Sequence, residues 1–228
     1  MNTPTKITFS RIILVEIMIL FLMVIDIIGM VNPHLISQTF GILIGDSHIN
    51  VVYLAVCIVF IIAASTDALD GYLARKNNQV TDLGKFLDPV ADKLLVNSLL
   101  IFLTVGGFMR AYTNVNQYCI PFFCVVLMVG RDIVVDCLRF VAAKKDVVIA
   151  ANIFGKAKTV AQMITIPLIL LNGWPFSYFD FNWPRDLRIV AFFVYITTIL
   201  SLVSGVIYVV QNRKVLTNGS KKARKSSK

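Results

Sequence analysis

Charged residues are scarce in this sequence of 228 amino acids. Only 15% of the residues are Asp, Glu, Lys or Arg, whereas 57% are hydrophobic. Soluble domains carry roughly 25% charged residues and few long apolar stretches. A helix that crosses a membrane needs about 20 mostly apolar residues, and the chain contains several such runs. The shortage of charge therefore excludes a soluble globular domain and predicts an integral membrane protein.

Cysteine and histidine are also few. The four cysteines lie in or at the ends of apolar runs, and none forms a Cys-x-x-Cys pair. The two histidines, His34 and His48, stand in a predicted loop without the spacing of metal ligands. This pattern is typical of buried hydrophobic cysteines, and it argues against a disulfide framework or a zinc site.

Apolar runs divide the chain into six predicted spans, at residues 12–30, 49–66, 93–109, 119–142, 158–172 and 189–211. They are apolar on all sides, so periodicity does not show which face is buried. The mixed segment 1–11 predicts a short helix lying in the membrane interface. The fold class is thus an all-α integral membrane protein with six transmembrane helices and a short N-terminal interfacial helix. We expect a membrane domain over 1–212 and a disordered basic tail over 213–228.

Positive charge exceeds negative charge, with 22 Lys and Arg against 13 Asp and Glu. The basic residues gather beside the spans and in the tail, which favours contact with anionic lipids over nucleic-acid binding. Segments 67–92 and 143–157 carry basic residues, whereas 31–48 contains no Lys or Arg. The positive-inside rule then predicts a multi-pass cell-membrane protein with both termini and segment 67–92 on the cytoplasmic side.

Five aspartates fall within segment 67–92, although acidic residues are scarce elsewhere. Asp67 and Asp70 are three residues apart at the end of the second span, and Asp88 and Asp92 are four apart where the third begins, so each pair can share a helix face. A carboxylate deep in a membrane costs about 2.5–3.5 kcal/mol, and neighbouring carboxylates repel one another. Two divalent cations would balance four such charges, and hard oxygen ligands favour Mg²⁺, Mn²⁺ or Ca²⁺; we expect Mg²⁺ or Mn²⁺.

A simpler interpretation is that these aspartates cap helices and pair with Arg75, Lys85 and Lys93. That interpretation suits one pair better than it suits four carboxylates at regular spacing. Asp82, the fifth aspartate, falls outside the spacing, and we expect it to be solvated. The full array therefore favours a two-metal site, which stabilises in-line displacement at phosphorus.

The same stretch reads D-x2-D-G-x2-A-R-x8-G-x3-D-x3-D from Asp67 to Asp92. It resembles the signature of the CDP-alcohol phosphatidyltransferases, with no position missing. Eight fixed positions match by chance on the order of once in 10⁹ starts. The resemblance implies six membrane helices, a homodimer, and a reaction in which an alcohol attacks the lipid-bearing phosphorus of CDP-diacylglycerol and CMP leaves.

The resemblance also implies roles for individual residues. Asp67, Asp70 and Asp88 would bind one metal ion, and Asp67, Asp88 and Asp92 the second, with Asp92 as the general base. The expected CDP-diacylglycerol contacts are Thr5, Thr8, Gly71, Ala74, Arg75, Thr81 and Gly84.

Two further stretches bear on the acceptor alcohol. The run from Arg131 to Arg139 resembles the R-E-x5-L-R stretch of phosphatidylglycerophosphate synthases, although Asp132 replaces the usual Glu; segment 155–163 resembles their G-K-x-K-T-x-x-Q-M. This resemblance implies glycerol 3-phosphate as the acceptor. Arg131 lies about a dozen residues inside its span; Asp132 is its neighbour, but no acidic partner stands on its own helix face, which favours a ligand. We expect Arg131, Arg139 and Lys156 to bind the acceptor phosphate; a pair between Arg139 and Asp136 is the alternative.

Other functions remain open at this point. The same chemistry with inositol phosphate, serine or another alcohol is the nearest alternative. An ion-coupled transporter would place its ionisable groups near the bilayer midplane on broken helices, whereas these aspartates lie at the ends of spans. A catalytically silent scaffold predicts a damaged aspartate array, and this array is intact.

Overall fold

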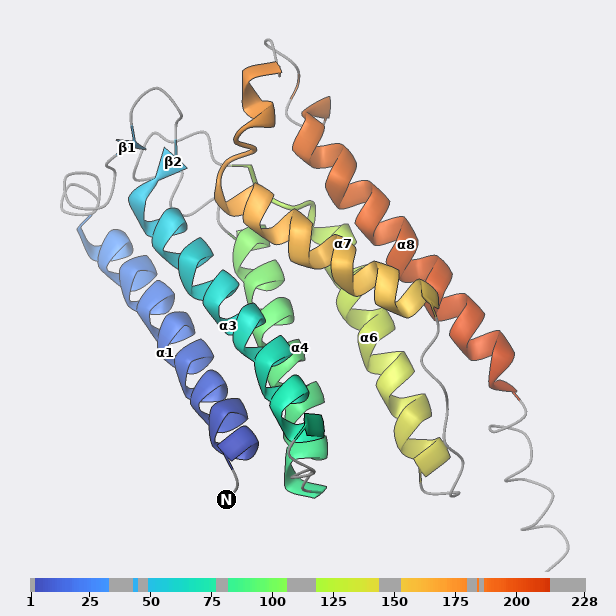
Figure 1. Ribbon diagram of the computed structural model, residues 1–228. Coiled ribbons are helices and arrows are strands. Elements are labelled where there is room, and N and C mark those ends of the chain that lie inside the picture. Colours follow the sequence, from blue (N-terminus) through green and yellow to red (C-terminus); the bar gives the residue numbers. More distant parts are fainter. Residues whose placement is uncertain are drawn as a thin grey trace, which may run out of the picture. The chain divides into compact units, whose positions relative to one another are not determined.

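The computed structural model describes residues 3–32, 43–44, 49–76, 82–105, 118–143, 153–179, 184 and 187–213. The side chains of 3–5, 26, 29–30, 43–44, 67–76, 82–86, 105, 143 and 177–178 fall outside that description. The long helices in the described ranges (Figure 1) are α1 (Thr3–Val31), α3 (Val51–Lys76), α4 (Asp82–Val105), α6 (Phe122–Ala143), α7 (Ile153–Leu170) and α8 (Ile189–Gln211). A 3₁₀ turn, η2 (Phe176–Phe179), follows α7. Two-residue strands β1 (Leu43–Ile44) and β2 (Ile49–Asn50) form an antiparallel pair.

The predicted helical class is confirmed, and each predicted span overlaps one of these helices. Within the described residues, three stretches are long and apolar enough to cross a membrane: Lys6–Ile25, Ile153–Leu170 and Ile189–Gln211. The chain is therefore a membrane protein. Val51–Thr66 is a shorter apolar part of α3.

The prediction of a separate interfacial helix over residues 1–11 was wrong. Helix α1 runs without a break from Thr3 to Val31. Pro4 lies in its first turn, where the missing N–H removes no helical hydrogen bond. No Gly or Pro follows until Gly29, so nothing in the local sequence interrupts the helix where its composition changes.

The chain divides into two compact units. The first unit comprises Met1–Ile120 and Met163–Ala191, and the second comprises Pro121–Gln162 and Phe192–Lys228. Helices α1, α3 and α4 belong to the first unit, whereas α6 and most of α8 belong to the second. Helix α7 contributes its first part to the second unit and its remainder to the first.

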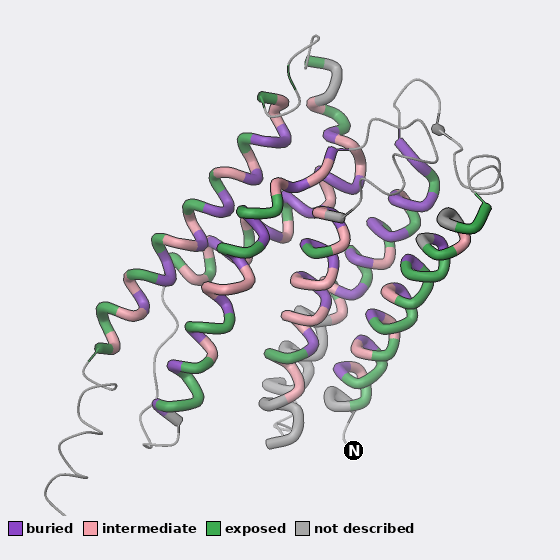
Figure 2. The backbone as a smooth tube through the Cα atoms, turned by 180° about the vertical axis from the view of Figure 1, so that it is seen from behind, coloured by how far each residue is buried: buried purple, intermediate pink, exposed green. Residues whose placement is uncertain are grey.

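In the first unit, α1 packs against α3 and α4, and α3 packs against α4. The buried residues of α1 recur every three or four positions along one side of the helix (Figure 2), as in a packed helix seam. The outward positions, such as Ile17 and Leu20, are exposed yet apolar, which suits contact with lipid. The buried positions are Thr8, Arg11, Val15, Met18, Leu22 and Ile25.

Two helix ends in this unit have specific capping geometry. The buried Asn50 side chain accepts a hydrogen bond from the Val52 N–H at 2.8 Å and so caps the start of α3. After α7, Asn172 and Gly173 have positive φ angles of 52° and 84°, and the Gly173 N–H donates to the Leu168 carbonyl at 2.7 Å. This is the Schellman geometry, with Asn172 in the left-handed position that glycine most often occupies and Gly173 directly after it.

Candidate active site

The four aspartates lie near the ends of two packed helices. Asp67 and Asp70 belong to α3, and Asp88 and Asp92 to α4, so both pairs have the helical spacing expected from sequence. Asp70 lies six residues before the end of α3 and Asp88 six residues after the start of α4, or about 9 Å along each axis. Only 77–81 joins the two helices, and a short connection between packed helices makes them antiparallel neighbours. The backbone therefore carries both pairs at the same end of this helix pair.

A residue of α1 reaches this end of α4. Thr8 Oγ1 donates a hydrogen bond to Asp88 Oδ1 at 2.8 Å, across 80 residues of sequence. Thr8 is only 2% exposed and Asp88 is half-buried, so water competes only in part with this hydrogen bond to a charged group. Thr8 was expected to contact CDP-diacylglycerol; in the structure it also orients a predicted metal ligand.

Arg11 follows Thr8 by one turn on the buried face of α1 and is 3% exposed. Sequence analysis did not single it out, because its place beside Thr8 in the helix seam appears only once the buried face is known. Its guanidinium brings a positive charge into the interior of the first unit. A buried cation is stable only with compensating partners, and this face of α1 also bears the contact to Asp88.

The remaining predicted residues of this region lie on helical backbone, except for Thr81, which is outside the described residues. Among the side chains that are described, no three acidic, Cys or His residues gather into a metal cluster. Asp67 and Asp70 are not among those side chains, so the four-carboxylate site stays a prediction. The residues placed on helical backbone are Thr5 in α1, Gly71, Ala74 and Arg75 in α3, and Gly84 in α4.

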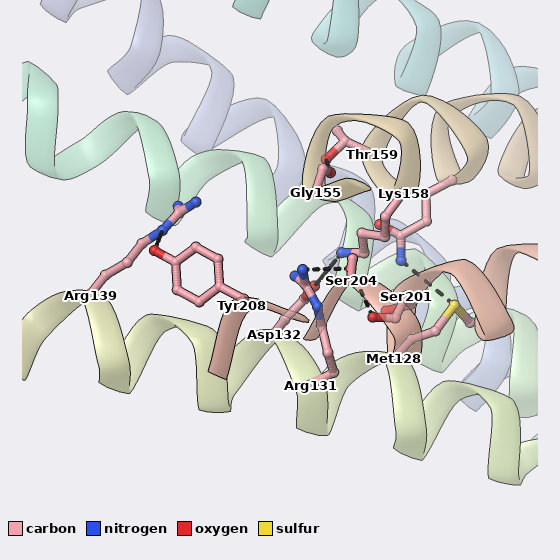
Figure 3. A network of polar contacts seen from close by, with 11 residues as sticks. Met128, Arg131, Asp132, Arg139, Gly155, Lys158, Thr159, Ser201, Ser204 and Tyr208 are labelled. Carbon is pink, nitrogen blue, oxygen red and sulfur yellow. Dashed lines mark hydrogen bonds and ion pairs between the residues drawn. The ribbon is translucent and has the colours of Figure 1, made fainter. Parts of the chain in front are cut away.

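The second unit contains a buried cluster of charged side chains (Figure 3). Asp132 accepts hydrogen bonds from Lys158 Nζ at 2.8 and 2.6 Å, one on each carboxylate oxygen. Its Oδ1 also accepts from Arg131 Nη1 at 3.0 Å, and Arg131 Nη2 donates to Ser204 Oγ at 2.7 Å. Sequence analysis found no acidic partner for Arg131 on its own helix face. In the structure Arg131 pairs with the adjacent Asp132, because its long stem lets the guanidinium reach the carboxylate of the next residue.

This cluster holds two cations and one anion. Asp132 is 3% and Lys158 6% exposed, and the Arg131 side chain is 12% exposed. Arg131 Nε is buried and has no hydrogen-bond partner among the described residues. Buried charges are normally balanced, so one surplus positive charge and one unused N–H suit an anionic ligand.

The sequence as a whole matches a known protein family. A sequence model of the family described as CDP-alcohol phosphatidyltransferase matches residues 1–210. The chain belongs to the CDP-alcohol phosphatidyltransferase family. It is therefore a phosphatidyltransferase, and the match extends over α8, which the sequence motifs do not reach.

Curated relatives resemble this phosphatidyltransferase along most of its length. A Bacillus subtilis protein is 37% identical over 215 residues, covering 94% of this chain and 97% of its own. A Mycoplasma pneumoniae protein is 34% identical over 223 residues, covering 93% and 88%. A Rickettsia bellii protein is 37% identical over 142 residues, covering 61% and 72%. All three are named CDP-diacylglycerol–glycerol-3-phosphate 3-phosphatidyltransferase.

The three cations predicted for the acceptor site of this phosphatidyltransferase do not share contacts in the described part of the chain. Arg139 is exposed; its Nε donates to Tyr208 Oη at 3.0 Å, and its guanidinium lies 5.5 Å from the ring centroid of the same tyrosine. Lys156 is exposed, and no recorded polar contact of the described residues joins it to Arg131. Lys158, two residues along, is the lysine that meets the Arg131 cluster.

Four residues of this cluster were missed as site residues by sequence reasoning: Asp132, Lys158, Ser204 and Gly205. Asp132 and Lys158 stand inside the motif-like stretches, so a signal for them was present. Ser204 and Gly205 lie on α8, where no motif pointed to them. Gly205 is buried, and a Cβ added there would lie 2.6 Å from Arg131 Cγ and 3.3 Å from its Nε.

Proposed function

We propose that this chain transfers the phosphatidyl group of CDP-diacylglycerol to glycerol 3-phosphate, giving phosphatidylglycerophosphate and CMP. The observation that carries the acceptor is the buried cluster of Arg131, Asp132 and Lys158, whose surplus positive charge suits a phosphorylated alcohol better than a neutral one. Arginine forms bidentate, charge-assisted bonds with phosphate. Relatives of 34–37% identity that carry this activity in their names support the same acceptor.

The carboxylates of α3 and α4 fit two hard divalent cations, Mg²⁺ or Mn²⁺, because the donor set consists of oxygens alone. Asp67, Asp70, Asp88 and Asp92 would hold them. When bound, such ions polarise the pyrophosphate of CDP-diacylglycerol and neutralise the departing CMP. Thr8 engages Asp88 Oδ1 and leaves Oδ2 for a cation.

The predicted site residues of the first unit also bind the nucleotide and accept the proton of the acceptor alcohol. Asp92 accepts the proton of the acceptor hydroxyl as that oxygen bonds to the phosphatidyl phosphorus, and the bond from phosphorus to the CMP oxygen breaks. Gly71, Ala74 and Gly84 lack bulky side chains and so leave room for cytidine beside the helices. Thr5, Arg75 and Thr81 are the proposed contacts to the CDP moiety.

An apolar cavity of about 410 Å³ lies between α1 and α3 and supports a lipid substrate. Its lining runs from Ser10 to Phe21 on α1 and from Ala55 to Val59 on α3. Every lining side chain except that of Ser10 is apolar. Ser10 stands two residues after Thr8, so the cavity begins at about the same level along the axis of α1 as the contact with Asp88. We assign it to an acyl chain of CDP-diacylglycerol.

The test of the proposed function is CMP release by the purified protein with CDP-diacylglycerol and Mg²⁺. Glycerol 3-phosphate, inositol phosphate, serine and glycerol are supplied in parallel. We expect glycerol 3-phosphate to support turnover at least about tenfold better than glycerol, because one charged hydrogen bond alone contributes about 1.5–3 kcal/mol. Turnover with serine or inositol phosphate alone would instead identify a sibling enzyme, and no CMP release with any alcohol would contradict the function.

We further propose that all six long helices cross the cell membrane, with both termini and the aspartates on the cytoplasmic side. The alternating basic excess of the connections supports this topology; the family resemblance alone supports a homodimer. Reporters fused after Lys228 and inserted next to His48 should lie on opposite sides of the membrane. A shared side for the two reporters would contradict the six-span topology.

A further inference from the structure

The Arg131 side chain lies against α8 at a position that only glycine accommodates. A Cβ at Gly205 would stand 2.6 Å from Arg131 Cγ, 3.3 Å from Nε and 3.5 Å from Cδ. A separation of 2.6 Å is far shorter than the 3.5–4.0 Å of favourable carbon contacts. Both the stem and the guanidinium of Arg131 would therefore have to move if this residue carried a side chain.

The preceding residue holds the other end of the same side chain. Ser204 Oγ accepts from Arg131 Nη2 at 2.7 Å and donates its own proton to the Ser201 carbonyl at 2.8 Å. Because that proton is already used, the hydroxyl presents lone pairs to the guanidinium. Asp132 holds Nη1, as Figure 3 shows, so Arg131 is fixed at both terminal nitrogens while Nε stays unused among the described residues.

We propose that Ser204 and Gly205 are positioning residues of α8 that set the orientation of Arg131 for the acceptor phosphate. Gly205 gives the stem its path across α8, and Ser204 fixes the guanidinium at the end of that path. Neither residue touches the acceptor; both act through Arg131. This inference rests on the proposed function, since it assigns α8 a part in acceptor recognition.

The test measures the KM values of purified variants for both substrates. Gly205→Ala should raise the KM for glycerol 3-phosphate about tenfold, the effect of losing one charged hydrogen bond, with the KM for CDP-diacylglycerol unchanged. Gly130→Ala is the matched control: it adds the same methyl group to the neighbour of Arg131, where a new Cβ meets nothing within 4 Å. It should leave both KM values as they are.

A double-mutant cycle separates positioning from general packing. In an Arg131→Ala background, Gly205→Ala should have no further effect on the KM for glycerol 3-phosphate, because the side chain that it displaces is gone. Additive effects of the two substitutions would overturn the proposal, as would an unchanged KM for glycerol 3-phosphate in Gly205→Ala.

Ser204→Ala supplies the second variant if Gly205→Ala does not fold. It adds no volume and removes only the acceptor of Arg131 Nη2, so it should raise the same KM and be silent in the Arg131→Ala background. An effect of Ser204→Ala that persists in that background would overturn the proposal. Failure of the proposed function can be distinguished from failure of this positioning role, because the unmutated protein would then release no CMP with glycerol 3-phosphate.

Discussion

Asp88→Asn is expected to lower CMP release at least about a hundredfold, the scale of losing one electrostatic group that stabilises a transition state. The substitution is nearly isosteric, and the amide oxygen of asparagine still accepts a hydrogen bond from Thr8. What it removes is a negative charge proposed to serve both cations. Steady-state CMP release at saturating substrates, measured over a range of Mg²⁺ concentrations, checks the expectation.

A second measurement detects the metal without turnover. A ligand that binds only the folded protein raises its unfolding temperature, so Mg²⁺ should stabilise the unmutated protein in detergent. Asp88→Asn should lose most of that increase. Without Mg²⁺ the variant should be no less stable, because one of several neighbouring negative charges is gone. Asp82→Asn is the control, and a large effect there with none at Asp88 would show that the aspartates were wrongly assigned.

Thr8→Val tests the same site with a milder change than Asp88→Asn. Valine matches the shape of threonine but cannot donate to Asp88, so the carboxylate keeps its charge and loses its orientation. Supporting hydrogen bonds around metal ligands are worth about 10- to 100-fold in metal affinity or activity. We expect a rise of that size in the Mg²⁺ concentration for half-maximal rate. An unchanged Mg²⁺ requirement would limit Thr8 to a packing role in α1.

The buried faces of the helices are the part of the fold that sequence could not provide. In α1, the inward Val15, Met18 and Leu22 differ little in hydropathy from the outward Ile17 and Leu20, which are exposed in the structure. In water, the contrast between polar and apolar faces reveals the core; a helix surrounded by lipid lacks that contrast. The existence and approximate range of each long helix were nevertheless predictable, because length and apolar character are enough for that.

Part of the candidate site could likewise be predicted from sequence, and part could not. The aspartate spacing predicted shared helix faces, and the helical positions of Asp67, Asp70, Asp88 and Asp92 agree. Position alone did not predict that Arg131 would pair with its own neighbour. Residues three or four apart share a helix face, but a long flexible stem also reaches an adjacent residue. Gly205 could not be found in this way, since its importance lies in the space it leaves for a residue of another helix.

Charge balance distinguishes the removal of Arg131 from the removal of Asp132 in the buried cluster. If Arg131 is removed, Asp132 keeps Lys158 on both carboxylate oxygens, and the pair stays neutral. Asp132→Ala would instead leave two cations buried without their anion, and breaking a buried pair in this way costs about 3–5 kcal/mol. Arg131 is thus the member that can be removed with the least damage to the fold, which makes it the informative position for acceptor binding.

Arg131→Ala should therefore raise the KM for glycerol 3-phosphate about ten- to a hundredfold, since a hydrogen bond to a charged group contributes about 1.5–3 kcal/mol. The KM for CDP-diacylglycerol should change little. Arg131→Lys should fall between, because an ammonium group keeps the charge but cannot serve Asp132 and Ser204 with a planar fork. Arg213→Ala, which removes an equal charge from an exposed residue at the end of α8, should leave both values unchanged. Steady-state kinetics with each substrate varied in turn tests whether Arg131 binds the acceptor phosphate. An equal loss of affinity for both substrates would show that Arg131 is a structural residue. The phosphate would then have to bind elsewhere.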